Sequence, residues 1–206
     1  MPQTPLIQLS AVGVPLDLAN VDTDQLIPAR FLKYPRDEKY RTYLFHDLRL
    51  KPDGADNPNF VLNNEPYRSN GRILVADRNF GCGSSRESAV YVLQDWGFRA
   101  VIAPSFGDIF FNNSFKNGFL PVRLPPEVCA KLRRDLHDDP GAEIKIDVEA
   151  QTITGPDNVL HPFEIDEFRK YCLMRGLDDI DFTLEHTAQI DAFERKNRPD
   201  WLGHNA

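Results

Sequence analysis

The sequence has few cysteines and lacks any long apolar run. Its three cysteines, Cys82, Cys129 and Cys172, lie far apart and form no C-x-x-C pair. This pattern excludes a disulfide framework and carries no local zinc or iron–sulfur signature, so we expect reduced thiols and no metal in this chain. No apolar stretch approaches the roughly 18 residues that span a membrane, so we expect no membrane attachment.

Basic residues are also in the minority. The 24 Lys and Arg and the 31 Asp and Glu give a formal charge of −7, which disfavours a nucleic-acid partner. Residues 1–5 contain no basic segment leading into an apolar one, so we expect no secretory signal and a place in the cytoplasm. The 206 residues suffice for a core, and we predict a single domain over residues 1–206.

Short apolar segments alternate with helical patterns in the middle of the chain. The expected strands are 6–18 (a strand or hairpin), 72–76, 100–103, 119–122, 144–148, 151–154 and 159–163, and the expected helices are 85–96, 106–115, 127–136, 166–174 and 183–196. Strands that alternate with helices indicate parallel pairing, and the later adjacent strands indicate antiparallel pairing. We therefore predict an α/β fold with a mixed sheet, a loop-rich insertion at about 34–70 and C-terminal helices at about 165–197.

The segment Asn79-Phe80-Gly81-Cys82-Gly83-Ser84-Ser85-Arg86-Glu87 lies between a predicted strand and a predicted helix. Glycines allow a sharp turn, and the start of a helix offers N–H groups to an anion. Arg86 could bind a carboxylate through two parallel hydrogen bonds. Ser84 to Glu87 also match the S-x-x-E capping box, in which case the loop is only structural. The glycine spacing fits neither a Walker loop nor a dinucleotide fingerprint.

The residues 81–87 resemble the signature loop of the aconitase superfamily's swivelling domain. Three further segments fit the same family, namely 20–30 (NVDTDQLIPAR), 102–110 (IAPSFGDIF) and 112–118 (NNSFKNG). Together they resemble the small subunits of the 3-isopropylmalate dehydratase family in their longer bacterial form. The resemblance implies a three-layer β/β/α swivelling domain.

The resemblance also implies a reaction and a partner. The family interconverts 2-isopropylmalate and 3-isopropylmalate through 2-isopropylmaleate in leucine biosynthesis, and its substrates are small hydroxy dicarboxylates. The large subunit of the family carries a [4Fe–4S] cluster, so this chain is expected to hold no cofactor and to act only with that partner. By the same resemblance, Ser84 is the catalytic base, Arg86 binds a carboxylate, and Ser85 and Gly83 contact the substrate.

Two more parts of the site follow from the resemblance. Thr23 and Asp24 match the family's Thr-Asp pair, with Thr23 at the substrate and Asp24 in a catalytic role, in which it orients the catalytic histidine of the large subunit. The alternative for Asp22-Thr23-Asp24 is an Asx turn or helix cap. Arg30, Phe31 and Leu32 begin the family's substrate-recognition loop, where an apolar contact would select the isopropyl group. The alternative is that Phe31 and Leu32 are core residues.

The chain departs from the family pattern at Ser88, where a histidine usually follows the glutamate. Other assignments stay open: a sister hydro-lyase (homoaconitase or citraconate/methylmalate hydratase), a non-enzymatic carboxylate-binding module, or an unrelated α/β protein with a capping box at Ser84.

Overall fold

The computed structural model describes residues 3–197. Within this range the strands are β1 (Gln8–Pro15), β2 (Gly71–Val75), β3 (Ala100–Ala103), β4 (Leu120–Arg123), β5 (Glu143–Asp147), β6 (Thr152–Thr154) and β7 (Leu160–Pro162). The longer helices are α4 (Ser88–Trp96), α5 (Asp108–Lys116), α6 (Pro126–Asp138), α7 (Glu167–Arg175), α8 (Asp179–Glu185) and α9 (Thr187–Lys196). The predicted domain also covers residues 1–2 and 198–206, which lie outside the described residues.

The strands form one mixed sheet in the order β4-β3-β2-β1-β5-β6-β7. Strands β1 to β4 pair in parallel, with Ile102 opposite Val122. Strands β5 to β7 continue the sheet beyond β1 in antiparallel pairing, with Ala11 of β1 opposite Ile144. The mixed sheet predicted from the alternating segments is confirmed.

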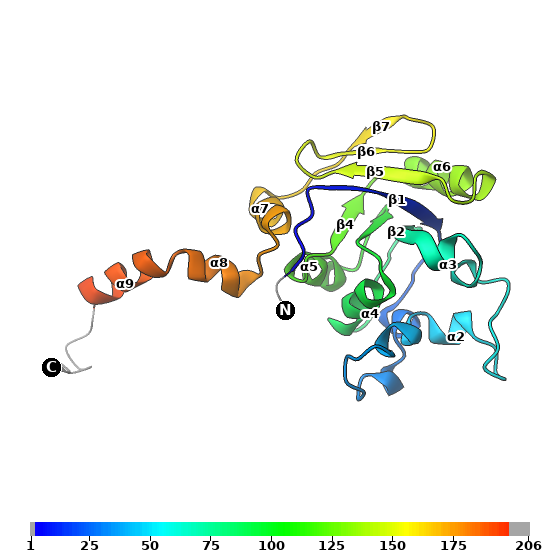
Figure 1. Ribbon diagram of the computed structural model, residues 1–206, viewed down its shortest axis with the longest axis horizontal. Coiled ribbons are helices and arrows are strands. Elements are labelled where there is room, and N and C mark those ends of the chain that lie inside the picture. Colours follow the sequence, from blue (N-terminus) through cyan, green and yellow to red (C-terminus); the bar gives the residue numbers. More distant parts are fainter. Residues whose placement is uncertain (1–2, 198–206) are drawn as a thin grey trace.

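Both faces of the parallel half of the sheet are covered by helices, because successive side chains of its strands point to opposite faces and are apolar on both. In β2, Leu74 packs on one face with Val90 of α4. Ile73 packs on the other face with Leu132 of α6. Inner side chains of the antiparallel half, such as Ile146 of β5, belong to the core around α6. Figure 1 shows β5 to β7 beyond β1, near α6.

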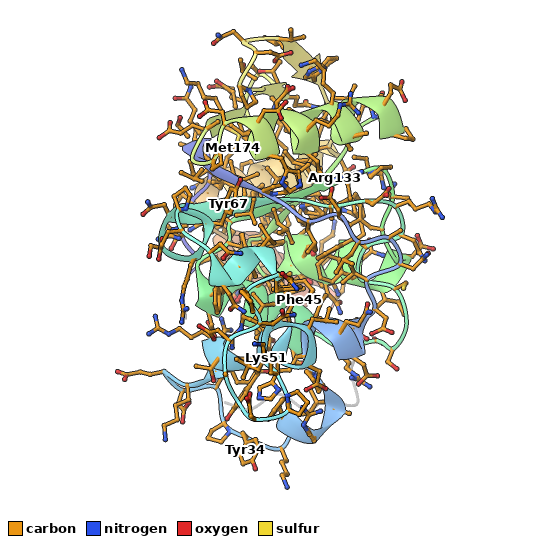
Figure 2. All side chains as sticks on the ribbon, turned by 90° about the vertical axis from the view of Figure 1, so that its right-hand side faces the viewer. Tyr34, Phe45, Lys51, Tyr67, Arg133 and Met174 are labelled. Atoms are coloured by element: carbon orange, nitrogen blue, oxygen red, sulfur yellow. The ribbon has the colours of Figure 1, made fainter. Side chains whose placement is uncertain are left out.

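The segment 34–70 contains short helical turns: η2 (Tyr40–Tyr43), α2 (His46–Arg49), η3 (Val61–Asn63) and α3 (Tyr67–Asn70). Phe45 is fully buried and its ring centroid lies 5.3 Å from that of Phe60. Arg49 is also buried, and its Nη2 donates to the carbonyl of Thr42 at 2.7 Å. Figure 2 shows Phe45 in the interior and Tyr34 at the outer end of this segment. The buried side chains of the insertion thus join the same core as those of β1, β2 and α4.

Two sequence predictions about helices are wrong. The helix expected from residue 85 begins only at Ser88. The last expected helix is two helices, α8 and α9, separated at His186, whose ring centroid lies 4.9 Å from that of Phe182. These two helices extend away from the rest of the molecule (Figure 1).

Candidate functional site

Three connections meet at the carboxyl ends of the parallel strands, where ligands of α/β sheets bind. The Gly81 N–H donates to the Val21 carbonyl at 2.7 Å, which joins the connection after β2 to that after β1. The Gly107 N–H donates to the Phe80 carbonyl at 2.9 Å, which joins it to the connection after β3. Segments that the resemblance identified separately therefore lie side by side and form one candidate site.

The glycine loop is bent by two residues with positive φ, Gly81 at +72° and Gly83 at +89°. A Cβ atom on Gly81 would lie 2.2 Å from Cγ of Phe110 in α5. Only glycine allows both this backbone angle and this approach. The loop thus rests directly on α5, with Phe80 and Phe106 packed edge-to-face beneath it.

Ser84 and Ser85 are exposed at the tip of this loop. Their hydroxyl groups donate no hydrogen bond within residues 3–197. The backbone N–H groups of residues 83–87 also lack an acceptor in that range. Free N–H groups next to an exposed hydroxyl are the kind of donors that bind an anion.

The capping-box alternative is wrong. Glu87 is itself the residue before α4, and no side chain caps that helix. The Glu87 carboxylate instead accepts from the Tyr91 hydroxyl at 2.9 Å and from Nδ2 of Asn117 at 3.1 Å. It ties the end of the loop to α4 and to the residue after α5, and it leaves Ser84 free.

Arg86 and Asp24 form a bidentate ion pair between the connection after β2 and the connection after β1. Nη1 and Nη2 of Arg86 donate to Oδ1 and Oδ2 of Asp24 at 2.5 and 3.0 Å. The Arg86 side chain is 16% exposed and that of Asp24 is 54% exposed. The hydrogen bond from Arg86 holds the pKa of Asp24 below its usual value. A guanidinium has five N–H donors, so about three remain for a ligand.

Asp22 and Thr23 support the loop from below. Asp22 and Gln25 form a capping box on α1 (Thr23–Leu26), so the helix-cap alternative is confirmed for Asp22. Thr23 is buried, and its Oγ1 donates to the Ser84 carbonyl at 3.0 Å. The structure therefore places Thr23 against the glycine loop, and its predicted contact with substrate stays a prediction.

Of the predicted recognition residues, Arg30 and Phe31 lie in η1 (Ala29–Phe31), shortly after α1, and Leu32 follows that turn. The Ala29 N–H donates to Oδ1 of Asp24 at 3.1 Å, which joins this segment to the Thr-Asp pair. Arg30 is paired with Asp47, which lowers the pKa of that carboxyl to about 2. Phe31 is half-buried and stacks on Tyr43 at 4.3 Å between ring centroids. Leu32 is 41% exposed.

The sequence left two alternatives for Phe31 and Leu32, a contact with substrate or a place in the core, and the structure separates the two residues. Phe31 is anchored against the core, and Leu32 is open to a ligand.

Ser88, where the chain departs from the family pattern, lies near Tyr40 of the insertion. Ser88 opens α4, and Tyr40 of the insertion packs against the same helix. Burial raises the pKa of Tyr40, and a hydrogen bond with Ser88 partly opposes that rise. Ser88 thus contacts the insertion, not the exposed tip of the loop.

Sequence reasoning missed the supports of the loop: Phe80, Phe106 and Phe110 beneath it, and the Glu87–Asn117 bond. These contacts are possible because Gly81 has a positive φ and because Gly107 approaches the loop closely. A Cβ atom on Gly107 would lie 2.5 Å from the Gly81 carbonyl oxygen. The sequence signal that could have predicted these contacts is the pair of glycines, Gly81 and Gly107, each next to phenylalanines.

The cysteines contribute no paired or metal-binding group in the described part of the chain. All three are free thiols, and burial raises the pKa of Cys129 to about 12. No group of three or more His, Cys, Asp or Glu side chains within residues 3–197 is placed to hold a metal ion. None of the helices in that range is long and apolar enough to span a membrane.

Similar proteins are known over most of the chain. A family model described as the aconitase C-terminal domain matches residues 3–127, and the model LeuD_N matches residues 130–167. The "3-isopropylmalate dehydratase small subunit" of Cereibacter sphaeroides is 50% identical over 91% of this chain and 93% of its own. The protein of the same name from Granulibacter bethesdensis is 52% identical over 90% of this chain and 88% of its own.

A solved structure has the same fold. The 3-isopropylmalate dehydratase structure from Methanocaldococcus jannaschii aligns with a TM-score of 0.64 at 24% identity, over 91% of this chain and 99% of that one. This likeness confirms the swivelling-domain fold that the resemblance implied.

Proposed function

This chain belongs to the family of 3-isopropylmalate dehydratase small subunits, and on that premise we propose that it supplies the base and the carboxylate-binding arginine of a shared active site. The enzyme is a hydro-lyase of leucine biosynthesis. The proposed reaction interconverts 2-isopropylmalate and 3-isopropylmalate by loss and return of water through 2-isopropylmaleate.

One observation supports this proposal above the others. The exposed Ser84 belongs to a loop whose N–H groups at residues 83–87 are free within residues 3–197, and it precedes Arg86 by two positions. The base form of serine is the alkoxide, which is too unstable at neutral pH without nearby positive charge. The free N–H groups and Arg86 provide that charge, and exclusion of water by a partner would strengthen it.

In this proposal Ser84 Oγ takes the proton from the carbon beside a substrate carboxylate and later returns a proton to the neighbouring carbon. Arg86 binds that carboxylate through the N–H donors that Asp24 leaves free, and Ser85 and Gly83 supply further donors. Asp24 keeps the guanidinium plane fixed. Thr23 fixes the Ser84 carbonyl, which sets the direction of the base.

The hydroxyl group of the substrate also needs help to leave. A [4Fe–4S] cluster on the large subunit would supply a Lewis acid for that step. The described residues of this chain do not form a metal site, and the hydroxyl, N–H and guanidinium groups around Ser84 fit an anion. We therefore assign the cluster to the partner and the proton transfer to this chain.

Leu32 and the edge of Phe31 would contact the isopropyl group. Burying three carbons at about 0.8 kcal/mol each gives roughly 2.4 kcal/mol, or about fifty-fold selectivity over a substrate without them. Arg30 would hold the segment in place through Asp47. The same proposal places the enzyme in the cytoplasm, which suits three free thiols.

The experiment is anaerobic co-expression of this chain with the large subunit of the same source. The purified complex is supplied with 3-isopropylmalate, and isopropylmaleate is followed by its ultraviolet absorbance. We expect turnover by the complex and none by either subunit alone. A stable complex that is inactive on isopropylmalate would indicate a sister substrate, and failure to form a complex would contradict the shared site.

A further inference from the structure

A cavity of about 620 Å³ lies where helix α5, the end of strand β4 and the segment between β7 and α7 meet. Its walls bring together three kinds of side chain: two arginines, two acidic residues and several aromatic rings. No residue of the glycine loop, the Thr-Asp pair or the recognition segment lines it. Its volume is in the range of small-molecule sites, about 300–1,000 Å³.

The arginines are held against aromatic rings. The Arg123 guanidinium lies 3.9 Å from the ring centroid of Phe111, and that of Arg169 lies 5.0 Å from the ring centroid of Phe115. Nη2 of Arg169 also donates to Oδ1 of Asn112 at 2.7 Å. Within the described part of the chain, neither guanidinium lies within 4.0 Å of a carboxylate. Stacking fixes the plane of a guanidinium and leaves N–H donors on its edge for a ligand.

The acidic residues Glu164 and Asp166 lie on the segment between β7 and α7. Oδ1 of Asp166 accepts the backbone N–H of Arg169 at 3.1 Å and so begins α7. Neither carboxylate lies within 4.0 Å of a lysine or arginine side chain among residues 3–197. Charges of both signs thus line one cavity without neutralising each other.

This arrangement selects the class of ligand. A dicarboxylate would satisfy the arginines but would be repelled by Glu164 and Asp166, so the cavity is not a second site for the hydroxy-acid substrate. A simple cation would bind the two carboxylates but would be repelled by Arg123 and Arg169. A zwitterion satisfies both groups, and the aromatic rings that also line the cavity fit an apolar side chain.

We propose that this cavity binds an α-amino acid with an apolar side chain. Its carboxylate binds the guanidinium groups of Arg123 and Arg169, and its ammonium group binds the carboxylates of Glu164 and Asp166. Its side chain lies on the rings of Phe111 and Phe115. Because the walls are open to solvent, we expect weak binding, with a Kd on the order of 1 mM.

The test uses the full chain without the large subunit, so it does not depend on the proposed catalytic role. L-leucine is titrated and followed by saturation-transfer NMR on its methyl groups. The Arg123→Gln variant should weaken binding about tenfold, because a charge-assisted hydrogen bond contributes about that factor. The Arg134→Gln variant, which changes an exposed arginine of α6, should bind L-leucine as the wild type does.

A second pair of probes tests the zwitterion directly. 4-Methylpentanoate has the same apolar group and carboxylate but no ammonium group. The Glu164→Gln variant should lose affinity for L-leucine and keep or gain affinity for 4-methylpentanoate, which a misfolded variant would not do. Absence of saturation transfer to L-leucine, or equal binding by the Arg123→Gln and Arg134→Gln variants, would overturn the proposal.

Discussion

At the scale of single residues, the site depends on a carboxylate and a guanidinium that are far apart in the sequence. Asp24 and Arg86 are separated by 62 positions and meet because β1 and β2 are parallel neighbours. The resemblance indicated both residues, but no local spacing predicts that they pair. The pair fixes the plane of the guanidinium, and in the proposed site this is a form of preorganisation for the substrate carboxylate.

The first prediction concerns this pair. Asp24→Asn removes the charge that orients Arg86, and we expect kcat/KM of the assembled enzyme to fall about tenfold, the low end for a charge-assisted hydrogen bond because Asp24 is largely exposed. The control is Asp138→Asn, an exposed carboxylate at the end of α6. Unchanged kcat/KM in the Asp24 variant would show that Arg86 needs no such support.

The second prediction concerns Asp47, whose pKa is lowered to about 2 by the hydrogen bond from Arg30. A carboxyl with a depressed pKa stabilises the fold above its unfolded pKa of about 3.9, and that contribution is lost as the pH falls through the folded pKa. We therefore expect the free energy of unfolding of Asp47→Asn to fall less steeply with acid between about pH 4 and pH 2. Urea titrations at several pH values measure it, and parallel slopes would contradict the ion pair.

At the scale of elements, the glycine loop takes its shape from helix α5. The loop approaches Phe110 so closely that a side chain at Gly81 has no room. The same contact transmits any displacement of α5 to the residues that follow Gly81.

The third prediction uses two glycines that both have a positive φ but differ in their surroundings. Gly54 has φ +83° with nothing within 4 Å of a built Cβ atom, whereas a Cβ on Gly81 would lie 2.2 Å from Phe110. We expect Gly54→Ala to cost about 1–2 kcal/mol of unfolding free energy from backbone strain alone. Gly81→Ala should cost about 1–3 kcal/mol more because of overpacking. Denaturant unfolding compares them, and equal losses would contradict close packing of the loop on α5.

The elements also show what sequence can predict. Strands β2 to β6 carry buried apolar side chains whose pattern predicts them to within a few residues, whereas β7 is largely exposed. The start of α4 was missed because Ser84 and Glu87 imitate a capping box, while the Glu87 carboxylate actually bonds to Tyr91 and Asn117. The separation of α8 from α9 was missed because no glycine or proline marks it. The Asp24–Arg86 pair depends on tertiary structure that no local pattern encodes.

At the scale of the whole molecule, stability is unevenly distributed. Helices α8 and α9 contain no buried residue, whereas the sheet and the helices α4 to α6 that cover it form the core. Large apolar side chains of α8 and α9, such as Ile180 and Phe193, are exposed. Helices this short are marginal on their own.

The fourth prediction follows from that distribution. A chain ending at Leu177 should keep its melting temperature within about 4 °C, the shift that about 1 kcal/mol produces in a protein of this size. In the full chain, the backbone amides of α8 and α9 should exchange with solvent faster than those of β1 to β4. A large drop in melting temperature, or slow exchange in α8 and α9, would contradict this view.

The central claim is that a serine on this chain completes an active site whose other half lies on the large subunit. The most direct measurement compares turnover of 3-isopropylmalate by assembled complexes that contain Ser84→Ala or Ser85→Ala, with co-purification as the check on assembly. We expect Ser84→Ala to assemble normally and to lower kcat at least about a hundredfold, as loss of a general base does. Ser85→Ala, which removes one hydroxyl next to the base, should lower it by about tenfold or less. Near-normal turnover by the assembled Ser84→Ala complex would contradict the account.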